Sequence, residues 1–260
     1  TISSNKILNM EVGVDLASSS SNEISNNIIK TWRCGIELDS SSNEISNNII
    51  KNSRCGIKLD SIGSSASIEG NVIKESETAI YLRYSKNCLV IENKITDNDV
   101  GIETYDSENN EIIENEITDN DVGIEIDCSR NNEIIENEIT DNDVGIDTYD
   151  SENNEIYHNN FDNELNVEMW DSESNTWDDG TQGNYWSDYD GTDINNNGIG
   201  DTSYTIDDNN KDRHPWMNPD GEGVNNKVVS TPVIDFIEDM LNNFDWPFPM
   251  LRVMLWAIGK

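Results

Sequence analysis

The chain has 260 residues, and 52 Asp and Glu against 16 Lys and Arg give a formal net charge of −36. This excess excludes nucleic acid as an expected partner, because its phosphates would be repelled; it suits divalent cations, a salty medium or a cationic partner. No run reaches the roughly 20 apolar residues that cross a bilayer, so no membrane span is expected. Disorder is excluded for residues 1–170, because their apolar residues recur at fixed intervals.

Asparagine recurs every 21–23 residues through eight units. These Asn are Asn5, Asn27, Asn48, Asn71, Asn93, Asn115, Asn137 and Asn159. Eight residues after each comes a small residue in seven units, Gly13, Gly35, Gly56, Ala79, Gly101, Gly123 and Gly145, whereas the eighth has Val167. Three apolar columns accompany them, as in Ile24, Ile29 and Ile36 of one unit.

This period predicts an all-β chain, a right-handed parallel β-helix of about eight coils over residues 1–170. Helical repeats need roughly 33 residues or more, and leucine-rich repeats need more Leu than the chain has. Asn, Asp, Ser and Ile are also poor helix formers. Three apolar columns with Asn and Gly turns indicate three strands per coil. We interpret the Asn as a stacking ladder that tolerates a left-handed turn and carries no chemistry.

Four Cys occur without a CxxC pair, which disfavours a zinc or redox motif. Cys34 and Cys55 occupy the same position in adjacent coils, where their Cα atoms would lie within disulfide range. A bond between them and two free thiols both remain open, because side chains stacked in register are not ideally aimed. Cys88 and Cys128 are expected to be unpaired.

Two residues after the small residue, the last three coils carry Glu103, Glu125 and Asp147. In-register stacking would place these carboxylates roughly 5 Å apart, which costs stability unless they are screened or bridged. One interpretation is a face that binds Ca²⁺ or polycations, and the other is a solvated acidic surface.

Beyond the coils, residues 171–227 are expected to form a cap with a calcium-type loop. The loop reads DINNNGIGD, and alternating oxygen-bearing residues around a Gly suit Ca²⁺. The expected ligands are Asp193, Asn195, Asn197, the carbonyl of Ile199 and Asp201. An Asn/Gly turn without a bound ion is the alternative.

Aromatic residues surround this loop. Trp177, Tyr185, Trp186 and Tyr189 could contact a glycan or form the core of the cap, which the open end of a solenoid requires. Residues 228–260 are expected to be an apolar helical tail with Pro232 at the first helical position. The tail would mediate self-assembly into an oligomer or filament through Phe236, Met240, Leu251, Leu255 and Trp256. Packing over its own solenoid and contact with lipid are the alternatives.

The repeat core NIIKTWRCGIEL (27–38), with WDDGTQGNYWSDYDGTDINNNGIGDTSYTI (177–206) and DRHPWMNP (212–219), resembles the NosD-like or CASH family of pectin-lyase-like β-helix proteins. The end module resembles those that close NosD-like surface proteins of archaea and bacteria. The resemblance implies an extracellular or cell-surface location.

We expect a non-enzymatic structural or adhesive β-helix, stabilised by calcium and self-assembling. A carbohydrate-binding module is the alternative, followed by a polysaccharide lyase or hydrolase of the same fold. Catalysis is disfavoured because the ITDNDVGI coils at 95–102, 117–124 and 139–146 are copies, whereas an active site needs one coil unlike the others. NosD-like maturation of a copper enzyme is disfavoured because the repeats have no His, Met and Cys cluster.

Overall fold

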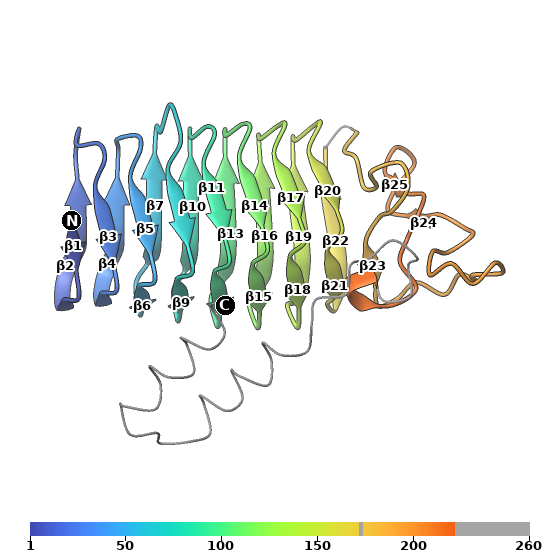
Figure 1. The fold of residues 1–260 in the computed structure, drawn as a ribbon, viewed down its shortest axis with the longest axis horizontal. Helices are drawn as coiled ribbons and strands as arrows, with labels where there is room; N and C mark the ends of the chain where they lie inside the picture. Colours follow the sequence, from blue (N-terminus) through green and yellow to red (C-terminus); the bar gives the residue numbers. More distant parts are fainter. Residues whose placement is uncertain (172–173, 222–260) are drawn as a thin grey trace, which may run out of the picture. The chain divides into compact units, whose positions relative to one another are not determined.

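The computed structural model describes residues 1–171 and 174–221, which form a parallel β-solenoid of stacked coils (Figure 1). Each coil has three faces, as the apolar columns predicted. The first face is an eight-stranded parallel sheet. Its strands are β1 (Ile2–Ser3), β3 (Glu23–Ser25), β5 (Glu44–Ser46), β8 (Ser67–Glu69), β11 (Leu89–Ile91), β14 (Glu111–Ile113), β17 (Glu133–Ile135) and β20 (Glu155–Tyr157).

The second and third faces belong to one 15-stranded sheet, because the long strands β2 (Lys6–Leu16) and β4 (Ile28–Leu38) run through both. The second face continues with β6 (Ile49–Lys51), β9 (Val72–Lys74), β12 (Lys94–Thr96), β15 (Glu116–Thr118), β18 (Glu138–Thr140), β21 (Asn160–Asp162) and β23 (Tyr185–Trp186). The third face continues with β7 (Cys55–Asp60), β10 (Thr78–Arg83), β13 (Val100–Tyr105), β16 (Val122–Asp127), β19 (Val144–Tyr149) and β22 (Leu165–Trp170).

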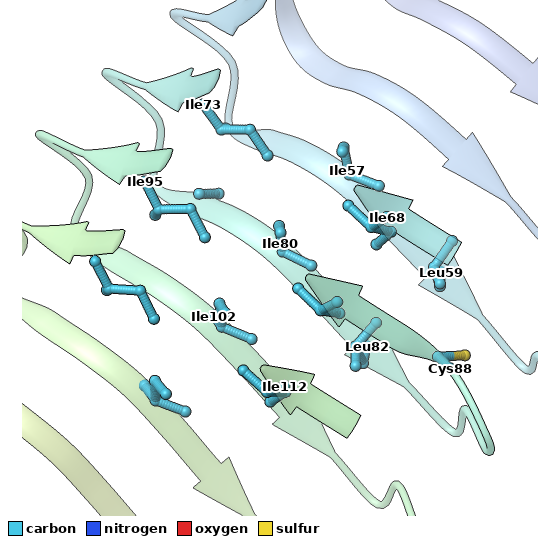
Figure 2. Packing of buried hydrophobic residues seen from close by; sticks show 14 of the residues in the cluster. Ile57, Leu59, Ile68, Ile73, Ile80, Leu82, Cys88, Ile95, Ile102 and Ile112 are labelled. Atoms are coloured by element: carbon cyan, nitrogen blue, oxygen red, sulfur yellow. The ribbon is translucent and has the colours of Figure 1, made fainter. Parts of the chain in front are cut away.

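The core is a set of apolar columns in which each residue stacks on its counterpart one coil away (Figure 2). Ile57, Ile80 and Ile102 form one such column on the third face, and all three are fully buried. The small residue of each coil has a steric reason. A Cβ on Gly35 would lie 2.5 Å from the carbonyl oxygen of Gly56 and 2.6 Å from a methyl of Ile50.

The predicted Asn ladder is present between the first and second faces. In each rung the backbone N–H and the side-chain amide of one Asn donate to the Oδ1 of the next, as Asn93 does to Asn115 at 3.0 and 2.9 Å. The ladder does not end at Asn159, as the sequence suggested, because Asn159 donates in the same way to Asn184. The left-handed turn also lies one residue earlier than expected, as at Asn26 and Glu114.

Other polar ladders stabilise the remaining turns, and the sequence interpretation missed them. Asn110, Asn132, Asn154 and Asn175 form one such ladder by the same hydrogen bonds. Asn98, Asn120 and Asn142 form a second, and Ser85, Ser107, Ser129 and Ser151 form a third. Every turn of the middle coils therefore satisfies buried backbone N–H groups with a side chain from the next coil.

Residues 174–221 cover the last coil with little regular structure. They contain β23, the antiparallel pair of β24 (Tyr204–Thr205) and β25 (Lys211–Asp212), and the 3₁₀ turn η1 (Pro219–Gly221). Two side chains from the β24–β25 hairpin end two of the ladders. Asn210 accepts from the N–H of Asn175 at 2.9 Å, and Asp212 accepts from that of Asn184 at 2.7 Å. The predicted helical tail, residues 228–260, lies outside the described residues.

Candidate functional site

The outer side of the third face carries two in-register rows of side chains that project away from the core, because successive residues of a strand alternate in direction. The first, the carboxylate row, consists of Glu103, Glu125, Asp147 and Glu168. The second, the aromatic row, lies two residues further along each strand and consists of Tyr105, Asp127, Tyr149 and Trp170. Both rows run along the solenoid axis, one residue per coil.

The carboxylate row is half-buried, and this changes its ionisation. Burial, with the charges of Glu103 and Asp147 on either side, raises the pKa of Glu125 to about 7. Burial likewise raises the pKa values of Glu103 and Asp147 above their usual range. These groups would therefore gain from hydrogen-bond donors or cations placed over them.

The aromatic row is open to solvent. Trp170 is 57% exposed and Tyr149 is 51% exposed, and Tyr84, which meets Tyr105 edge to face at 5.7 Å, is 38% exposed. Such rings combine an apolar face with a polar edge, which suits them to stacking on ligands that are themselves amphipathic. The rings of Tyr105, Tyr149 and Trp170, with Asp127 between the first two, lie beside the carboxylate row and offer stacking and hydrogen bonding along the same axis.

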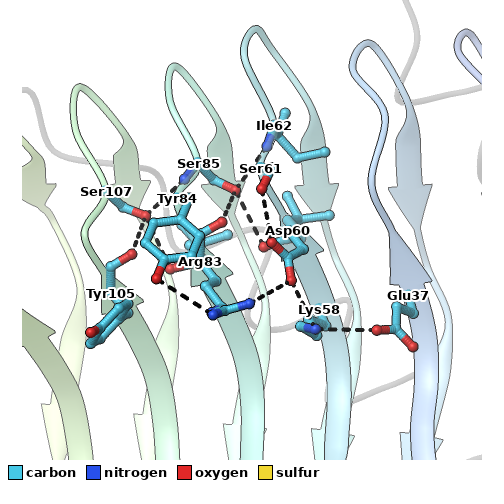
Figure 3. A network of polar contacts seen from close by, with 12 residues as sticks. Glu37, Lys58, Asp60, Ser61, Ile62, Arg83, Tyr84, Ser85, Tyr105 and Ser107 are labelled. Atoms are coloured by element: carbon cyan, nitrogen blue, oxygen red, sulfur yellow. Dashed lines mark hydrogen bonds and ion pairs between the residues drawn. The ribbon is translucent and has the colours of Figure 1, made fainter. Parts of the chain in front are cut away.

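Towards the N-terminal end, the same face turns from acidic to mixed charge. Lys58 contacts Glu37 at 3.2 Å and Asp60 at 3.0 Å, and Arg83 contacts Asp60 at 3.1 Å (Figure 3). Arg83 also lies over the ring of Tyr84, 4.5 Å from its centroid. Burial alone would raise the pKa of the Asp60 carboxyl. The hydrogen bonds that it accepts from Lys58 and Arg83 outweigh burial and lower its pKa below the ordinary value.

This mixed-charge patch borders a recess lined by Arg33, Cys34, Glu37, Arg54, Cys55, Lys58, Glu77, Thr78, Tyr81 and Glu103. Lys58, Tyr81 and Glu103 stack on three successive coils. Thr78 donates a hydrogen bond to Glu103 at 3.3 Å, and burial raises the pKa of Tyr81 to about 12. The recess thus brings an amine, a phenol and a carboxyl to one place, which the sequence did not predict.

Cys34 and Cys55 lie directly opposite each other on β4 and β7, as predicted from their repeat positions. Both are free thiols in this structure. Hydrogen bonding from Cys34, together with burial, raises the pKa of Cys55 well above its usual value. Their disulfide remains a prediction. Cys88 and Cys128 are also free.

The loop predicted to bind calcium closes on its own backbone. Asp193 accepts from the N–H groups of Asn197 and Gly198 at 3.2 and 2.8 Å, and Asp201 accepts from that of Ile194 at 2.6 Å. The side chain of Asn195 accepts from the N–H of Asn197, and the side chain of Asn197 accepts from the N–H of Ile199. Within residues 1–171 and 174–221, no group of three or more His, Cys, Asp or Glu is arranged to hold a metal ion. Calcium binding stays a prediction.

The aromatics assigned to glycan contact are divided by the structure. Trp177 and Trp186 are each 1% exposed, which contradicts glycan contact for these two residues and agrees with the alternative, the core of the cap. Trp186 stacks between Phe161 and Tyr204, with centroids 4.5 and 4.3 Å away, because the last coil needs an apolar cover. Tyr185 and Tyr189 keep part of their surface exposed. The rings open to a ligand lie instead on the third face; alternation along its strands could have indicated them.

The predicted assembly residues Phe236, Met240, Leu251, Leu255 and Trp256 lie outside the described residues. In the part of the chain that the structure describes, no helix is long and apolar enough to cross a membrane.

The stacked coils and their in-register sheets define a parallel β-helix protein. Residues 1–191 match the family model described as "Periplasmic copper-binding protein (NosD)", and the chain belongs to this NosD family. No curated protein sequence matches it.

Two solved structures share the fold. The enzymatically active domain of bacteriophage CBA120 tailspike protein 2 is 12% identical, with a TM-score of 0.50 over 71% of this chain and 40% of that one. The A-module of Azotobacter vinelandii mannuronan C-5 epimerase AlgE4 is 15% identical, with a TM-score of 0.53 over 65% of this chain and 55% of that one. The chain thus spans about half the length of these structures.

Within residues 1–171 and 174–221, the side chains do not fit a copper centre of the kind that the family description implies. Copper sites need several His, Cys or Met ligands at one point. The chain has two His, and His158 and His214 face Asp179 at 3.2 Å and Asp178 at 3.3 Å, respectively, in separate contacts. Among the described residues, Cys34 and Cys55 belong to no group of three or more His, Cys, Asp or Glu arranged to hold a metal ion.

Proposed function

We propose that this chain is a non-enzymatic adhesive β-helix that binds polysaccharide along its third face, outside the cytoplasm. The observation that carries the proposal is the aromatic row, with Tyr149 and Trp170 more than half exposed, beside the carboxylate row. The family description, "Periplasmic", supports the location.

The geometry suits an extended sugar chain lying parallel to the solenoid axis. Adjacent coils are about 4.8 Å apart, close to the rise of one residue in an extended sugar chain. Ring faces would stack on Tyr149 and Trp170, and hydroxyl or amino groups would donate to Glu125 and Asp147, whose carboxyl oxygens accept hydrogen bonds.

The test is retention on acidic, neutral and amino-sugar polysaccharides in affinity electrophoresis. Tyr149→Ala and Trp170→Ala should each weaken retention roughly 3- to 10-fold, the effect of losing one stacked ring. Trp32→Ala is the matched control, because Trp32 is 63% exposed but lies outside the aromatic row. The proposal fails if no polysaccharide retains the protein, or if the Trp32 variant loses as much as the Trp170 variant.

A polysaccharide-modifying enzyme is a second candidate, favoured by the recess in which Lys58, Tyr81 and Glu103 meet. A half-buried carboxyl with a raised pKa beside a phenol and an amine is a grouping suited to proton transfer. Incubation with the retained polysaccharide, followed by assays of reducing ends, unsaturated products and sugar configuration, separates the candidates. Activity lost in Glu103→Gln but kept in Glu116→Gln would establish the enzyme and overturn the non-enzymatic proposal.

A further inference from the structure

Charge is distributed unevenly along the solenoid. Residues 1–94 contain ten Lys and Arg against eleven Asp and Glu, whereas residues 95–221 contain three against thirty-six. The N-terminal coils are therefore close to neutral, and the C-terminal coils carry almost all of the net negative charge. One surface in each half combines a row of like charges with an apolar row, and the charges of the two surfaces are opposite.

The lysine face lies on the second face in the N-terminal coils. Lys30, Lys51 and Lys74 stack in register on β4, β6 and β9. Two residues earlier on the same strands is an apolar row of Ile28, Ile49 and Val72, of which Ile28 and Ile49 are 42% and 43% exposed.

The lysines have little compensation within the described coils. Lys30 and Lys51 have no ion-pair partner there, and Lys74 has one contact with Glu75 at 3.7 Å. Like charges stacked in register repel each other, and exposed isoleucines beside them are poorly solvated. The lysine face therefore has the composition of a surface that is covered by a partner.

The acidic face lies on the first face in the C-terminal coils. Glu111, Glu133 and Glu155 stack in register on β14, β17 and β20, and all three are exposed. Two residues later on the same strands is a half-buried apolar row of Ile113, Ile135 and Tyr157. None of the three glutamates has an ion-pair partner among the described residues.

We propose that the lysine face of one copy of this chain docks on the acidic face of a second copy. Both faces consist of one charged row and one apolar row, two residues apart, over three coils. Both rows repeat at the same coil spacing of about 4.8 Å, so three lysines can each meet one glutamate while the apolar rows cover each other. An unrelated partner would match this period only by coincidence, whereas a second copy has it by construction.

The third-face carboxylate row is a poorer match for the lysine face. Its members Glu103, Glu125 and Asp147 are half-buried, and the residues two positions further along their strands are Tyr105, Asp127 and the exposed Tyr149, not an apolar row. The exposed glutamates of the first face lie beside the half-buried apolar row of Ile113, Ile135 and Tyr157, and the lysines likewise lie beside an apolar row. Glycan binding and self-association therefore use different faces.

The contact is heterologous, because it joins two different surfaces. Each added copy leaves one lysine face and one acidic face free, so association continues into chains unless it closes into a ring. Three exposed ion pairs contribute modestly and are screened by salt. Association should accordingly weaken as ionic strength rises.

Sedimentation velocity of the full chain at low and high salt tests the proposal. Lys30→Glu, Lys51→Glu and Lys74→Glu in one variant, and Glu111→Lys, Glu133→Lys and Glu155→Lys in another, should each weaken self-association roughly 10- to 100-fold. Mixing the two variants should restore it, since each reversed face then finds an oppositely charged one. Asp99→Lys, Asp121→Lys and Asp143→Lys change the same number of exposed charges outside both faces and should not weaken it.

Circular dichroism confirms that each variant is folded. If a triple variant is not, the single variants Lys51→Glu and Glu133→Lys replace it, with the same loss and rescue expected in smaller degree. The proposal is overturned if the wild type is monomeric at low salt, if association persists in both reversed variants, or if mixing fails to rescue. A monomeric wild type that binds heparin through Lys51 would show that an anionic polymer, and not a second copy, covers the lysine face.

Discussion

The carboxyl of Asp212 ends the main Asn ladder by accepting the backbone N–H of Asn184 at 2.7 Å. It also accepts the indole N–H of Trp186 at 2.9 Å and the N–H of His214 at 2.9 Å. Asp212 is fully buried. One side chain therefore joins the last rung, the aromatic core of the cap and the β24–β25 hairpin.

Asp212→Ala should strongly destabilise the protein. It would leave buried N–H donors on Asn184 and Trp186 without acceptors, at about 1–3 kcal/mol each. Urea unfolding followed by Trp fluorescence measures the loss. Asp208→Ala is a control in the same hairpin, because Asp208 is exposed and lies outside the ladders, and equal losses in the two variants would contradict the ladder-ending role.

The same residue predicts a pH dependence. Burial raises the pKa of Asp212 to about 6 in the folded state, above the ordinary value of 3.8. Between these values the folded state holds more protons than the unfolded state, so this group makes stability fall as pH rises. Asp212→Asn should flatten that part of the stability profile between pH 4 and 6. An unchanged slope would mean that Asp212 is ionised throughout.

The ionisation of Glu125 should also lower the stability of the fold as pH rises, but over a higher pH range than that of Asp212. Its folded pKa of about 7 lies above the ordinary 4.5, so its contribution to stability declines as pH rises from 4.5 to 7. Glu125→Gln should stabilise the protein above pH 7 by about 1 kcal/mol, after allowance for its partial exposure, and should have little effect at pH 4. Thermal melts across this range measure it, with the first-face variant Glu111→Gln as control.

Several turns carry a residue poorly suited to its backbone. Glu114 and Glu136 have φ values of 54° and 57°, at the position where earlier coils have Asn26 and Asn47. Because Asn tolerates the left-handed region better than Glu, Glu114→Asn and Glu136→Asn should each stabilise the solenoid by up to about 1 kcal/mol. Chemical denaturation measures the gain. Glu114→Gln removes only the charge, and an equal gain from it would assign the effect to electrostatics.

Calcium binding by the 193–201 loop gives a ligand-dependent prediction. Saturating Ca²⁺ should raise the free energy of unfolding by about 1–3 kcal/mol through preferential binding to the folded state. Asp193→Asn and Asp201→Asn should abolish the rise, whereas Asp208→Asn, outside the loop, should keep it. Calorimetry with Ca²⁺ and with chelator decides. If the melting temperature does not change with Ca²⁺, the loop is an Asn/Gly turn closed by its own hydrogen bonds and binds no calcium.

Oxidation should join Cys34 to Cys55. Closing a loop of about 20 residues contributes about 3 kcal/mol on entropic grounds. In a Cys128→Ser background, treatment with oxidised glutathione should remove two free thiols and raise the melting temperature. The reaction should be faster at alkaline pH, because hydrogen bonding from Cys34 and burial raise the pKa of Cys55. Thiol titration that still finds both groups free would show that the stacked side chains cannot align.

The sequence by itself determined the repeat. Residues of one column must stack in every coil, so the spacing of Asn27, Asn48 and Asn71 and of the Ile columns was enough to predict three strands per coil. It was also enough to predict that Cys34 and Cys55 lie opposite each other in adjacent coils. Periodicity works here because each coil contacts mainly its two neighbours.

Only the tertiary structure decided what lies outside that periodicity. The cap has no repeat, so nothing in the sequence could show that Asp212 reaches Asn184, or that Trp186 is buried between Phe161 and Tyr204. Alternation along the strands could indicate that Tyr149 and Trp170 point outward, but where each coil turns decides that Lys51 and Glu133 lie on different faces. Side chains distant in sequence become neighbours only when the coils stack. Stacking depends on contacts between adjacent coils, which recur at a fixed spacing in the sequence. A cap or a surface depends on contacts between residues far apart in the sequence, which follow no such spacing.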